Sequence, residues 1–187
     1  MPRLNRVTPF GDIIATPERG NFMGNRDVLH GDNRNIRRSW QLKRWLVCML
    51  EFRDRHPKMM TPNRYTELFF LDEVTALAAG NRPCAECRHT RFLDFCPAWA
   101  AVSRGTSRSQ RPTADEIDRR LHAERLAPHR SNRTFSASLN DLSDGVFIHQ
   151  PAWARTTISF GAADYLPGPP TDTPAESPDP KPRLCVF

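Results

Sequence analysis

A Cys-x-x-Cys pair at Cys84 and Cys87 is the feature of the sequence that most constrains how the chain can fold. The segment 83–87 reads Pro-Cys-Ala-Glu-Cys and follows Ala-Ala-Gly at 78–80. Two thiols three residues apart in a tight turn can point at one metal ion, and such a knuckle supplies two of the four ligands of a tetrahedral zinc site. The sequence therefore predicts a sharp turn here and half of a metal site, whose other half must come from elsewhere in the chain.

The composition is typical of a soluble protein with one domain, or with one domain and a tail. The 187 residues contain no apolar run of about eighteen residues, so we expect no membrane-spanning helix and no membrane partner. The first residues lack the apolar segment of a secretory signal. Five cysteines at irregular spacing do not suggest a disulfide framework. We therefore expect a cytoplasmic location.

The net charge of +6 is concentrated in the first half of the chain. Residues 1–92 contain 16 Lys and Arg against 10 Asp and Glu, whereas residues 93–187 contain 11 of each kind. Most of the cations are Arg, whose planar fork suits phosphate and carboxylate groups. A basic half makes a nucleic-acid partner plausible. A charge of this size is also ordinary for a soluble domain, so both interpretations stay open.

The pattern of apolar residues predicts an α+β fold with a β-rich N-terminal part. The run at 45–52 is nearly all apolar and has the length of a buried strand rather than a helix. A second strand is expected at 65–70, and the turn residues at 31–33 suggest a hairpin between two further strands.

Three helices are expected after these strands. Asp72 is a suitable N-cap for a short helix that Gly80 ends. A helix after the knuckle should kink or restart at Pro97, which has no N–H to donate. Thr113 begins a capping box, Thr-Ala-Asp-Glu, that starts a helix running to about Leu126.

We expect four segments along the chain. Seven of the last 21 residues are Pro, so that stretch is expected to be disordered and could anchor a protein partner. The predicted segments are a β-rich domain with the knuckle at 1–102, a linker at 103–112, a helix and small hairpin at 113–166, and a Pro-rich tail at 167–187.

Residues 65–88 resemble the second half of Ada-like metal-binding domains. The shared features are the aromatic strand ending in Phe-Phe at 69–70, the helix that ends in Ala-Gly at 79–80, and Arg-Pro-Cys-x-x-Cys at 82–87. The resemblance implies zinc bound by four ligands, two of them Cys84 and Cys87, and carries over no other residue. The longer pattern around it is also similar to a group of bacterial proteins without an assigned activity.

The second pair of metal ligands is not evident from the sequence. Cys48, in the apolar run, is the nearest thiol before the knuckle, and His30, His56 and His89 are the other donors that we consider. A bound zinc ion would join the knuckle to the β-rich part and add to folding stability. Two alternatives stay open. The thiols can pack as small apolar groups without a metal, or they can form a redox-active pair at a helix N-terminus.

A basic segment with two tryptophans, residues 34–45, is the second candidate site. Such a segment can follow a phosphate backbone while an indole stacks on a base. The alternative is that the tryptophans belong to the core and the cations are solvated. The candidate nucleic-acid-binding residues are Arg34, Arg37, Arg38, Lys43, Arg44 and Trp40.

These features predict a binding module that contacts nucleic acid and is stabilised by zinc. One alternative is a metal-dependent nuclease or hydrolase in which His30, followed by Gly-Asp-Asn-Arg-Asn at 31–35, acts as general base. Another is an interaction subunit of a larger assembly. No catalytic residue is assigned, and whether the protein is an enzyme is left open.

Overall fold

The computed structural model describes residues 2–53, 59–103, 111–127, 132–136, 142, 146–149, 157–158 and 183–185. Contacts between residues group the chain into two compact units, Met1–Asn132 and Arg133–Val186. Within the described ranges, no helix is both long enough and apolar enough to cross a membrane.

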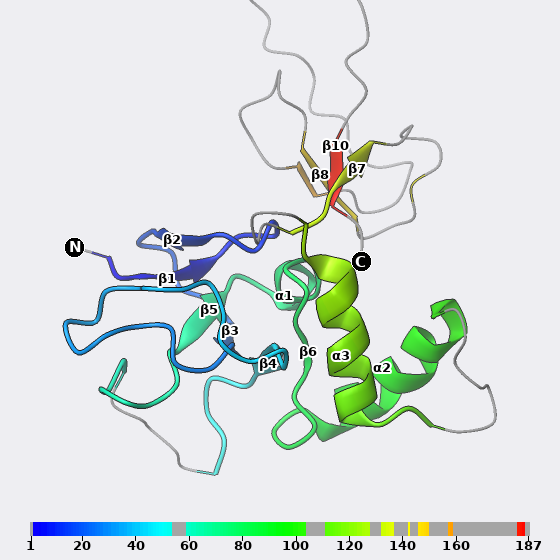
Figure 1. Cartoon of the computed structure of the whole chain (residues 1–187), viewed down its shortest axis with the longest axis horizontal. Helices are drawn as coiled ribbons and strands as arrows, with labels where there is room; N and C mark the ends of the chain where they lie inside the picture. Colours follow the sequence, from blue (N-terminus) through cyan, green and yellow to red (C-terminus); the bar gives the residue numbers. More distant parts are fainter. Residues whose placement is uncertain are drawn as a thin grey trace, which may run out of the picture. The chain divides into compact units, whose positions relative to one another are not determined.

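A six-stranded mixed sheet forms the first unit, which is strand-rich as predicted (Figure 1). Its strand order is β2-β1-β5-β3-β4-β6. The pairs β1–β5 and β4–β6 are parallel and the other pairs are antiparallel. The strands are β1 (Leu4–Val7), β2 (Ile13–Ala15), β3 (Phe22–Asn25), β4 (Leu46–Cys48), β5 (Leu68–Phe70) and β6 (Arg82–Pro83).

Apolar side chains of this sheet and of the short helix α1 (Glu73–Ala78) make the main core. Gly24 on β3 leaves room for the ring of Phe70 on β5, because a Cβ atom at position 24 would overlap that ring. The fully or nearly fully buried members of this core are Val7, Leu29, Val47, Leu68, Phe70, Ala76 and Ala79.

The ends of α1 are those predicted from the sequence. The Asp72 carboxylate accepts a hydrogen bond from the Thr75 N–H at 2.7 Å, which satisfies one of the unpaired donors of the first turn. Gly80 has φ of +81° and donates its N–H to the Leu77 carbonyl, as expected of a residue that follows a helix. The chain then enters β6 and the knuckle.

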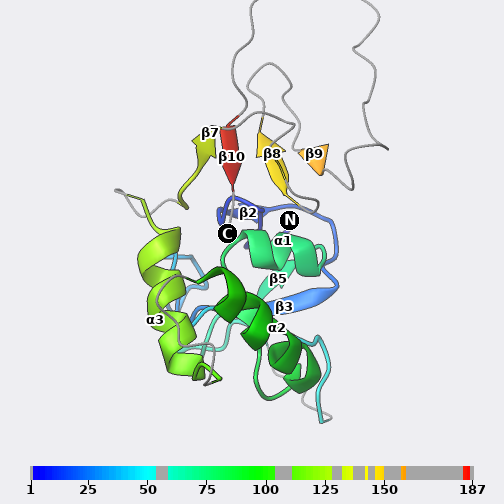
Figure 2. The same cartoon turned by 90° about the vertical axis from the view of Figure 1, so that its right-hand side faces the viewer.

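Two longer helices, α2 (His89–Val102) and α3 (Ala114–Arg125), lie side by side (Figure 2). Phe92, Cys96 and Trp99 of α2 pack with Ile117 of α3 in a second apolar cluster. The helix does not restart at Pro97, since α2 continues through it. Pro97 itself is exposed, and packing of buried residues on both sides of it against α3 stabilises a continuous helix.

The capping box at the start of α3 is confirmed in its first half. The Thr113 hydroxyl accepts a hydrogen bond from the Glu116 N–H at 3.2 Å. Contacts place α3 in the first unit, whereas the sequence predicted that it belongs with a separate segment 113–166. The physical reason is that buried side chains of α3 bond to β6 and to the loop before β4, as described below.

The second unit contains a four-stranded antiparallel sheet with the order β7-β10-β8-β9. Strand β8 pairs with β9, within the segment 113–166 for which a helix and a small hairpin are expected. Strand β10 lies inside the predicted Pro-rich tail, whose other residues are outside the described part, as is most of the predicted linker. The strands are β7 (Phe135–Ser136), β8 (Phe147–His149), β9 (Thr157–Ile158) and β10 (Arg183–Cys185).

Candidate metal centre

The parallel pairing of β4 with β6 brings Cys48 beside the knuckle. Val47 pairs with Pro83, and the Cys84 N–H donates to the Val47 carbonyl at 3.0 Å. Cys48 follows Val47 and Cys84 follows Pro83, so the two cysteines lie beside each other where the strand pair ends. A contact between residues 36 positions apart thus follows from the register of two short strands.

The turn after Cys84 brings in the third thiol. The Arg88 N–H donates to the Cys84 carbonyl at 3.1 Å, which closes the turn before α2. The backbone N–H groups of Cys87 and Glu86 donate to the Cys84 sulfur, and the Met49 N–H donates to the Cys87 sulfur. Such donors stabilise a negative charge on sulfur.

The sulfur atoms of Cys48, Cys84 and Cys87, here called the cysteine cluster, all lie within 4.8 Å of one another. Cys48 is buried and the other two are half-buried. Zinc binds thiolate sulfur at about 2.3 Å, so ligand sulfurs of a tetrahedral site are separated by about 3.8 Å. The cluster is therefore compact enough to hold a metal ion.

Hydrogen bonding among the three thiols shifts their pKa values in different directions. Hydrogen bonding with Cys84 and Cys87, together with burial, raises the pKa of Cys48 far above its ordinary value. Hydrogen bonding with the Cys48 and Cys87 thiols lowers the pKa of Cys84, against the effect of burial. For Cys87, hydrogen bonding with Cys48 lowers the pKa, but the neighbouring Cys84 and burial raise it overall. The opposite shifts favour loss of the first proton from Cys84, and a bound cation would allow all three thiols to ionise.

His30, a predicted ligand and the candidate general base, is not brought to the cysteine cluster. Its ring is buried, with Nδ1 2.6 Å from the Thr66 hydroxyl and Nε2 3.2 Å from the Thr61 carbonyl oxygen. The Leu29 N–H also donates to the Thr66 hydroxyl. These contacts give His30 a structural role in joining its turn to the segment before β5.

The other two histidines considered as ligands are not in the cysteine cluster either. His56 lies outside the described residues. His89 is exposed, and its Nδ1 lies 2.9 Å from the Ala85 carbonyl oxygen. Among the described residues, the cluster contains no His, Asp or Glu and no fourth Cys.

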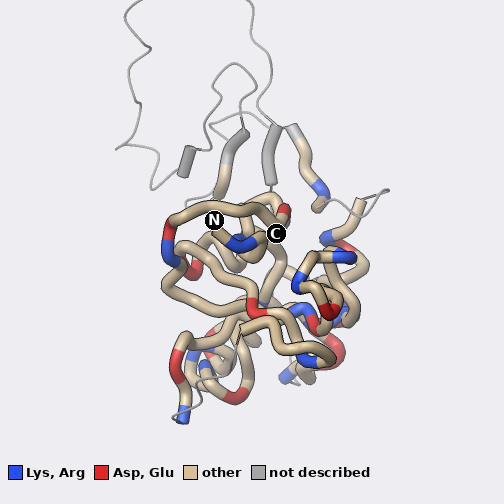
Figure 3. Tube along the Cα trace, turned by 90° about the vertical axis from the view of Figure 1, so that its left-hand side faces the viewer, with Lys and Arg blue, Asp and Glu red and all other residues tan. Residues whose placement is uncertain are grey.

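The basic segment forms an exposed loop between β3 and β4. The main chain folds back through an antiparallel bridge between His30 and Ile36. Lys and Arg (blue) are interspersed with Asp and Glu (red) along the trace of the described part (Figure 3). The cations of this loop nevertheless have no ion-pair partner among the described residues. The exposed cations, here called the basic loop cations, are Arg34, Arg37, Arg38, Lys43 and Arg44.

The two tryptophans of the basic segment pack inward. Trp40 is half-buried and meets the His122 ring edge-on, with ring centroids 4.4 Å apart. Trp45 is 2% exposed and donates its indole N–H to the Leu42 carbonyl at 3.0 Å. The indoles thus hold the loop against α3, which is the core interpretation that the sequence left open.

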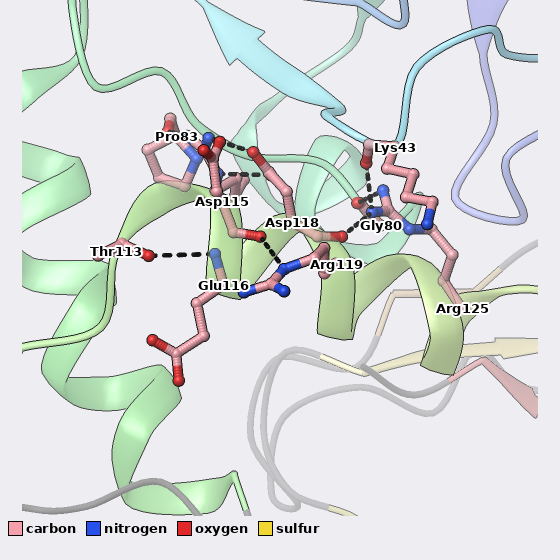
Figure 4. A network of polar contacts seen from close by, with 10 residues as sticks. Lys43, Gly80, Pro83, Thr113, Asp115, Glu116, Asp118, Arg119 and Arg125 are labelled. Carbon is pink, nitrogen blue, oxygen red and sulfur yellow. Dashed lines mark hydrogen bonds and ion pairs between the residues drawn. The ribbon is translucent and has the colours of Figure 1, made fainter.

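A group of buried charged residues around Trp45 was missed by the sequence analysis; we call it the arginine core. The Arg82 guanidinium bonds both oxygens of Asp118, at 2.8 and 2.7 Å. Arg125 donates to the carbonyl oxygens of Gly80 at 2.6 Å and Lys43 at 2.9 Å (Figure 4). The members are Arg26, Trp45, Arg82, Asp118 and Arg125, all at most 4% exposed.

A weak sequence signal for this group exists on α3. Asp118 and Arg125 are seven residues apart, next to the buried Ile117, so they lie on the inward face of the helix. Charged residues on such a face normally have partners.

Comparison with models of known protein families, with curated proteins and with solved structures gives no match. Function is therefore argued from the residues of this chain. The fold and the site define an α+β protein with three converging cysteines that can hold a metal ion.

Proposed function

We propose that this protein is a nucleic-acid-binding module whose fold is stabilised by a zinc ion bound to Cys48, Cys84 and Cys87. The observation that carries the proposal is the convergence of three sulfur atoms from β4 and the knuckle within 4.8 Å. A structural metal ion at this point would join two strands and the start of α2, so metal binding would contribute directly to folding stability.

Zinc is the metal that this donor set favours. Thiolate sulfur is a soft ligand that suits zinc, and structural zinc sites commonly combine several cysteines in tetrahedral geometry. The resemblance of residues 65–88 to Ada-like domains supports the same metal. Cys48, Cys84 and Cys87 would occupy three positions of the tetrahedron, and one position would be left for a further donor.

The basic loop supports the nucleic-acid part of the proposal. Its five cations are exposed, lie within eleven consecutive positions, and have no ion-pair partner among the described residues. Cations of this kind can neutralise phosphates with release of counterions. Trp40 anchors the loop through its contact with His122, so phosphate contacts, not base stacking, carry this binding.

Binding without cleavage is the better proposal for this arrangement. A general base needs a ring nitrogen that can reach a water molecule or substrate. Both ring nitrogens of His30 already have protein partners, Thr66 and Thr61. We therefore do not assign His30 a catalytic role.

Elemental analysis tests the metal part. Purified wild-type protein from zinc-supplemented cells should contain about one zinc per chain, and Cys48→Ser and Cys84→Ser should each lose it. Cys96→Ala is the matched control: Cys96 is fully buried in the other apolar cluster, so this change should lower stability and leave the metal content unchanged. Wild-type protein without metal, or full zinc content in both serine variants, would contradict the proposal.

Salt-dependent titration tests the nucleic-acid part. The double variant Arg38→Glu/Arg44→Glu should weaken binding to short DNA duplexes and reduce the slope of log K against log salt by about two units, because each lost phosphate contact contributes nearly one unit. Arg19→Glu/Arg64→Glu, which reverses two exposed cations elsewhere, is the control for net charge. Equal affinities of the two double variants would exclude a role for the basic loop.

A further inference from the structure

A pocket of about 190 Å³ lies against Trp45, on the side of the first unit that contains Gly11 and the basic loop. No cysteine contributes to it, so it is separate from the candidate metal centre. Its lining residues are Leu4, Phe10, Gly11, Asp12, Ile13, Arg26, Ile36, Ser39, Trp45 and Asn132.

Two buried donors at this pocket have no acceptor among the described residues. Arg26 is 0% exposed. Its Nη1 donates to the Gly11 carbonyl at 3.1 Å, and its Nη2 lies 3.3 Å from the acceptors Ala79 O and Asn81 Oδ1, but its Nε has no partner. The Asn132 Nδ2 is likewise buried and unpartnered. Buried N–H groups are nearly always bonded, so each of these calls for an acceptor.

Gly11 and Asn132 form one wall of the pocket. Gly11 has φ of +87°, and a Cβ atom at this position would lie 2.5 Å from the Asn132 Nδ2. The amide therefore packs directly on the Gly11 backbone, whose carbonyl accepts from Arg26. This contact brings the two unpartnered side chains to the same part of the pocket.

The guanidinium groups that lie over Trp45 have the exposed Asp12 and the Arg82-bound Asp118 as nearby carboxylates. The guanidinium carbons of Arg26 and Arg125 lie over the Trp45 ring, at 3.8 and 4.3 Å from its centroid. Neither guanidinium forms an ion pair with a described residue, and the Asp118 carboxylate is bonded to Arg82. Burial lowers the pKa of Arg26 to about 9, with Arg125 acting in the same direction and Asp12 against it. Arg26 therefore remains a cation at neutral pH.

We propose that this pocket binds a small organic carboxylate, whose oxygens accept hydrogen bonds from Arg26 Nε and Asn132 Nδ2. The apolar part of the ligand would lie against Phe10, Ile13 and Ile36. A buried cation without an ion-pair partner is costly, and an anionic ligand reduces that cost. A single water molecule needs only about 10–15 Å³, so the volume accommodates an organic molecule.

The exposed Asp12 restricts the charge of the ligand. Asp12 is a lining residue of the pocket, as Arg26 is, and its charge acts on Arg26, so a second negative charge on the ligand would be repelled. A monoanion such as a carboxylate is therefore preferred to a phosphate dianion. The proposal uses neither the cysteine cluster nor the basic loop cations, so it stands or fails apart from the proposed function.

Nuclear magnetic resonance of the arginine Nε–Hε groups tests this inference on the full chain. Benzoate and phenyl phosphate share one ring and differ in the oxyanion. Benzoate should shift the Arg26 Nε–Hε and Trp45 indole signals in a saturable way and bind more tightly than phenyl phosphate. Tighter binding of phenyl phosphate would overturn the assignment to a carboxylate, and no saturable shift with either compound would leave a water-filled pocket and overturn the proposal.

Two exposed positions on one loop give a matched pair of variants. Ser39→Glu places a carboxylate on the pocket wall and should weaken benzoate binding by about tenfold or more, because like charges would then face each other. Gln41→Glu adds the same charge two residues away, outside the lining, and should change binding by less than about twofold because solvent screens it. Similar benzoate affinities of the two variants would contradict the proposed position of the ligand. Both positions are exposed, so the test does not require replacing the buried Arg26.

Discussion

The strand pair β4–β6 carries two different centres at its two ends. The arginine core gathers around Trp45, which precedes β4, and Arg82, which begins β6. The cysteine cluster forms where the same strands end, at Cys48 and Cys84. In the arginine core, most buried donors already have acceptors from the chain itself. In the cysteine cluster, the three thiols are hydrogen-bonded to one another, and the fourth position of a tetrahedral site has no donor among the described residues.

The difference lies in what each centre needs from outside the protein. Guanidinium groups keep their charge and can be satisfied by carbonyl oxygens, so the arginine core can form as the chain folds. Thiols become strong ligands only after losing protons, so the full strength of the cysteine cluster depends on a metal ion. Substitutions should therefore damage the first centre most, and removal of metal should damage the second.

The largest expected effect is the loss of Asp118. In Asp118→Ala, the Arg82 guanidinium loses both of its carboxylate bonds and stays buried, because Arg82 is 2% exposed. Breaking a buried ion pair in this way costs about 3–5 kcal/mol. Urea unfolding should show this loss. The control is Asp115→Ala, an exposed residue on the same helix, which should cost less than about 1 kcal/mol. Similar losses of stability in the two variants would mean that the ion pair between Asp118 and Arg82 adds nothing to stability.

Removal of metal should have the next largest effect, at the other end of the strand pair. A chelator should lower the free energy of unfolding of the wild type by about 2.7 kcal/mol if free metal was present at a hundred times its dissociation constant. Cys84→Ser should be insensitive to the chelator, whereas Asp118→Ala should lose as much as the wild type. If the urea midpoint of the wild type does not change with the chelator, a bound metal ion does not contribute to the stability of the cysteine cluster.

Replacing Arg125 by Lys separates charge from hydrogen bonding in the arginine core. Lysine keeps the cation but cannot place donors at both the Gly80 and Lys43 carbonyl oxygens. We expect a loss of about 2 kcal/mol, in the range of a hydrogen bond to a charged group. Arg119→Lys, on the exposed side of α3, is the control and should be nearly neutral. If both variants unfold alike, charge alone accounts for the role of Arg125.

The contrast between the two centres also explains what could be predicted from the sequence. The knuckle, the caps at Asp72 and Thr113, and the turn at Gly80 are local, so a few adjacent residues specify them. Cys48 was one of several possible ligands, because its place beside Cys84 depends on the register of two strands far apart in the chain.

The arginine core could not be predicted because it depends on contacts over even longer separations. Arg125 bonds to Lys43 O, 82 residues away. In a chain rich in Arg, nothing local distinguishes a guanidinium that will be buried from one that stays in solvent. The same limit applies to Trp45: the basic segment left both base stacking and a core position open for its indoles, and Trp45 is the apolar surface on which Arg26 and Arg125 lie.

The smallest expected effect is a pH dependence at the edge of the arginine core. His122 packs against Trp40 and Trp45, and its Nδ1 is buried without a partner among the described residues. Burial lowers the pKa of His122 below its ordinary value, and the nearby Arg125 and Lys43 lower it further. The unfolded chain, with a histidine pKa of about 6.5, therefore binds the proton more readily than the native state. The contribution of His122 to stability is complete above that pH and is lost as the pH falls through the native pKa.

His122→Gln isolates this contribution, because glutamine does not titrate between about pH 5 and 8. Both proteins should be unfolded in urea with a chelator present, since protons also displace a metal ion from thiolates and would otherwise add their own pH dependence. The wild type should lose stability between about pH 6.5 and 5 more steeply than the variant. Parallel curves of unfolding free energy against pH for the two proteins would show that His122 has the same pKa in the native and unfolded states. Acid would then act on this molecule through its other ionisable groups, the carboxylates among them, and not through His122.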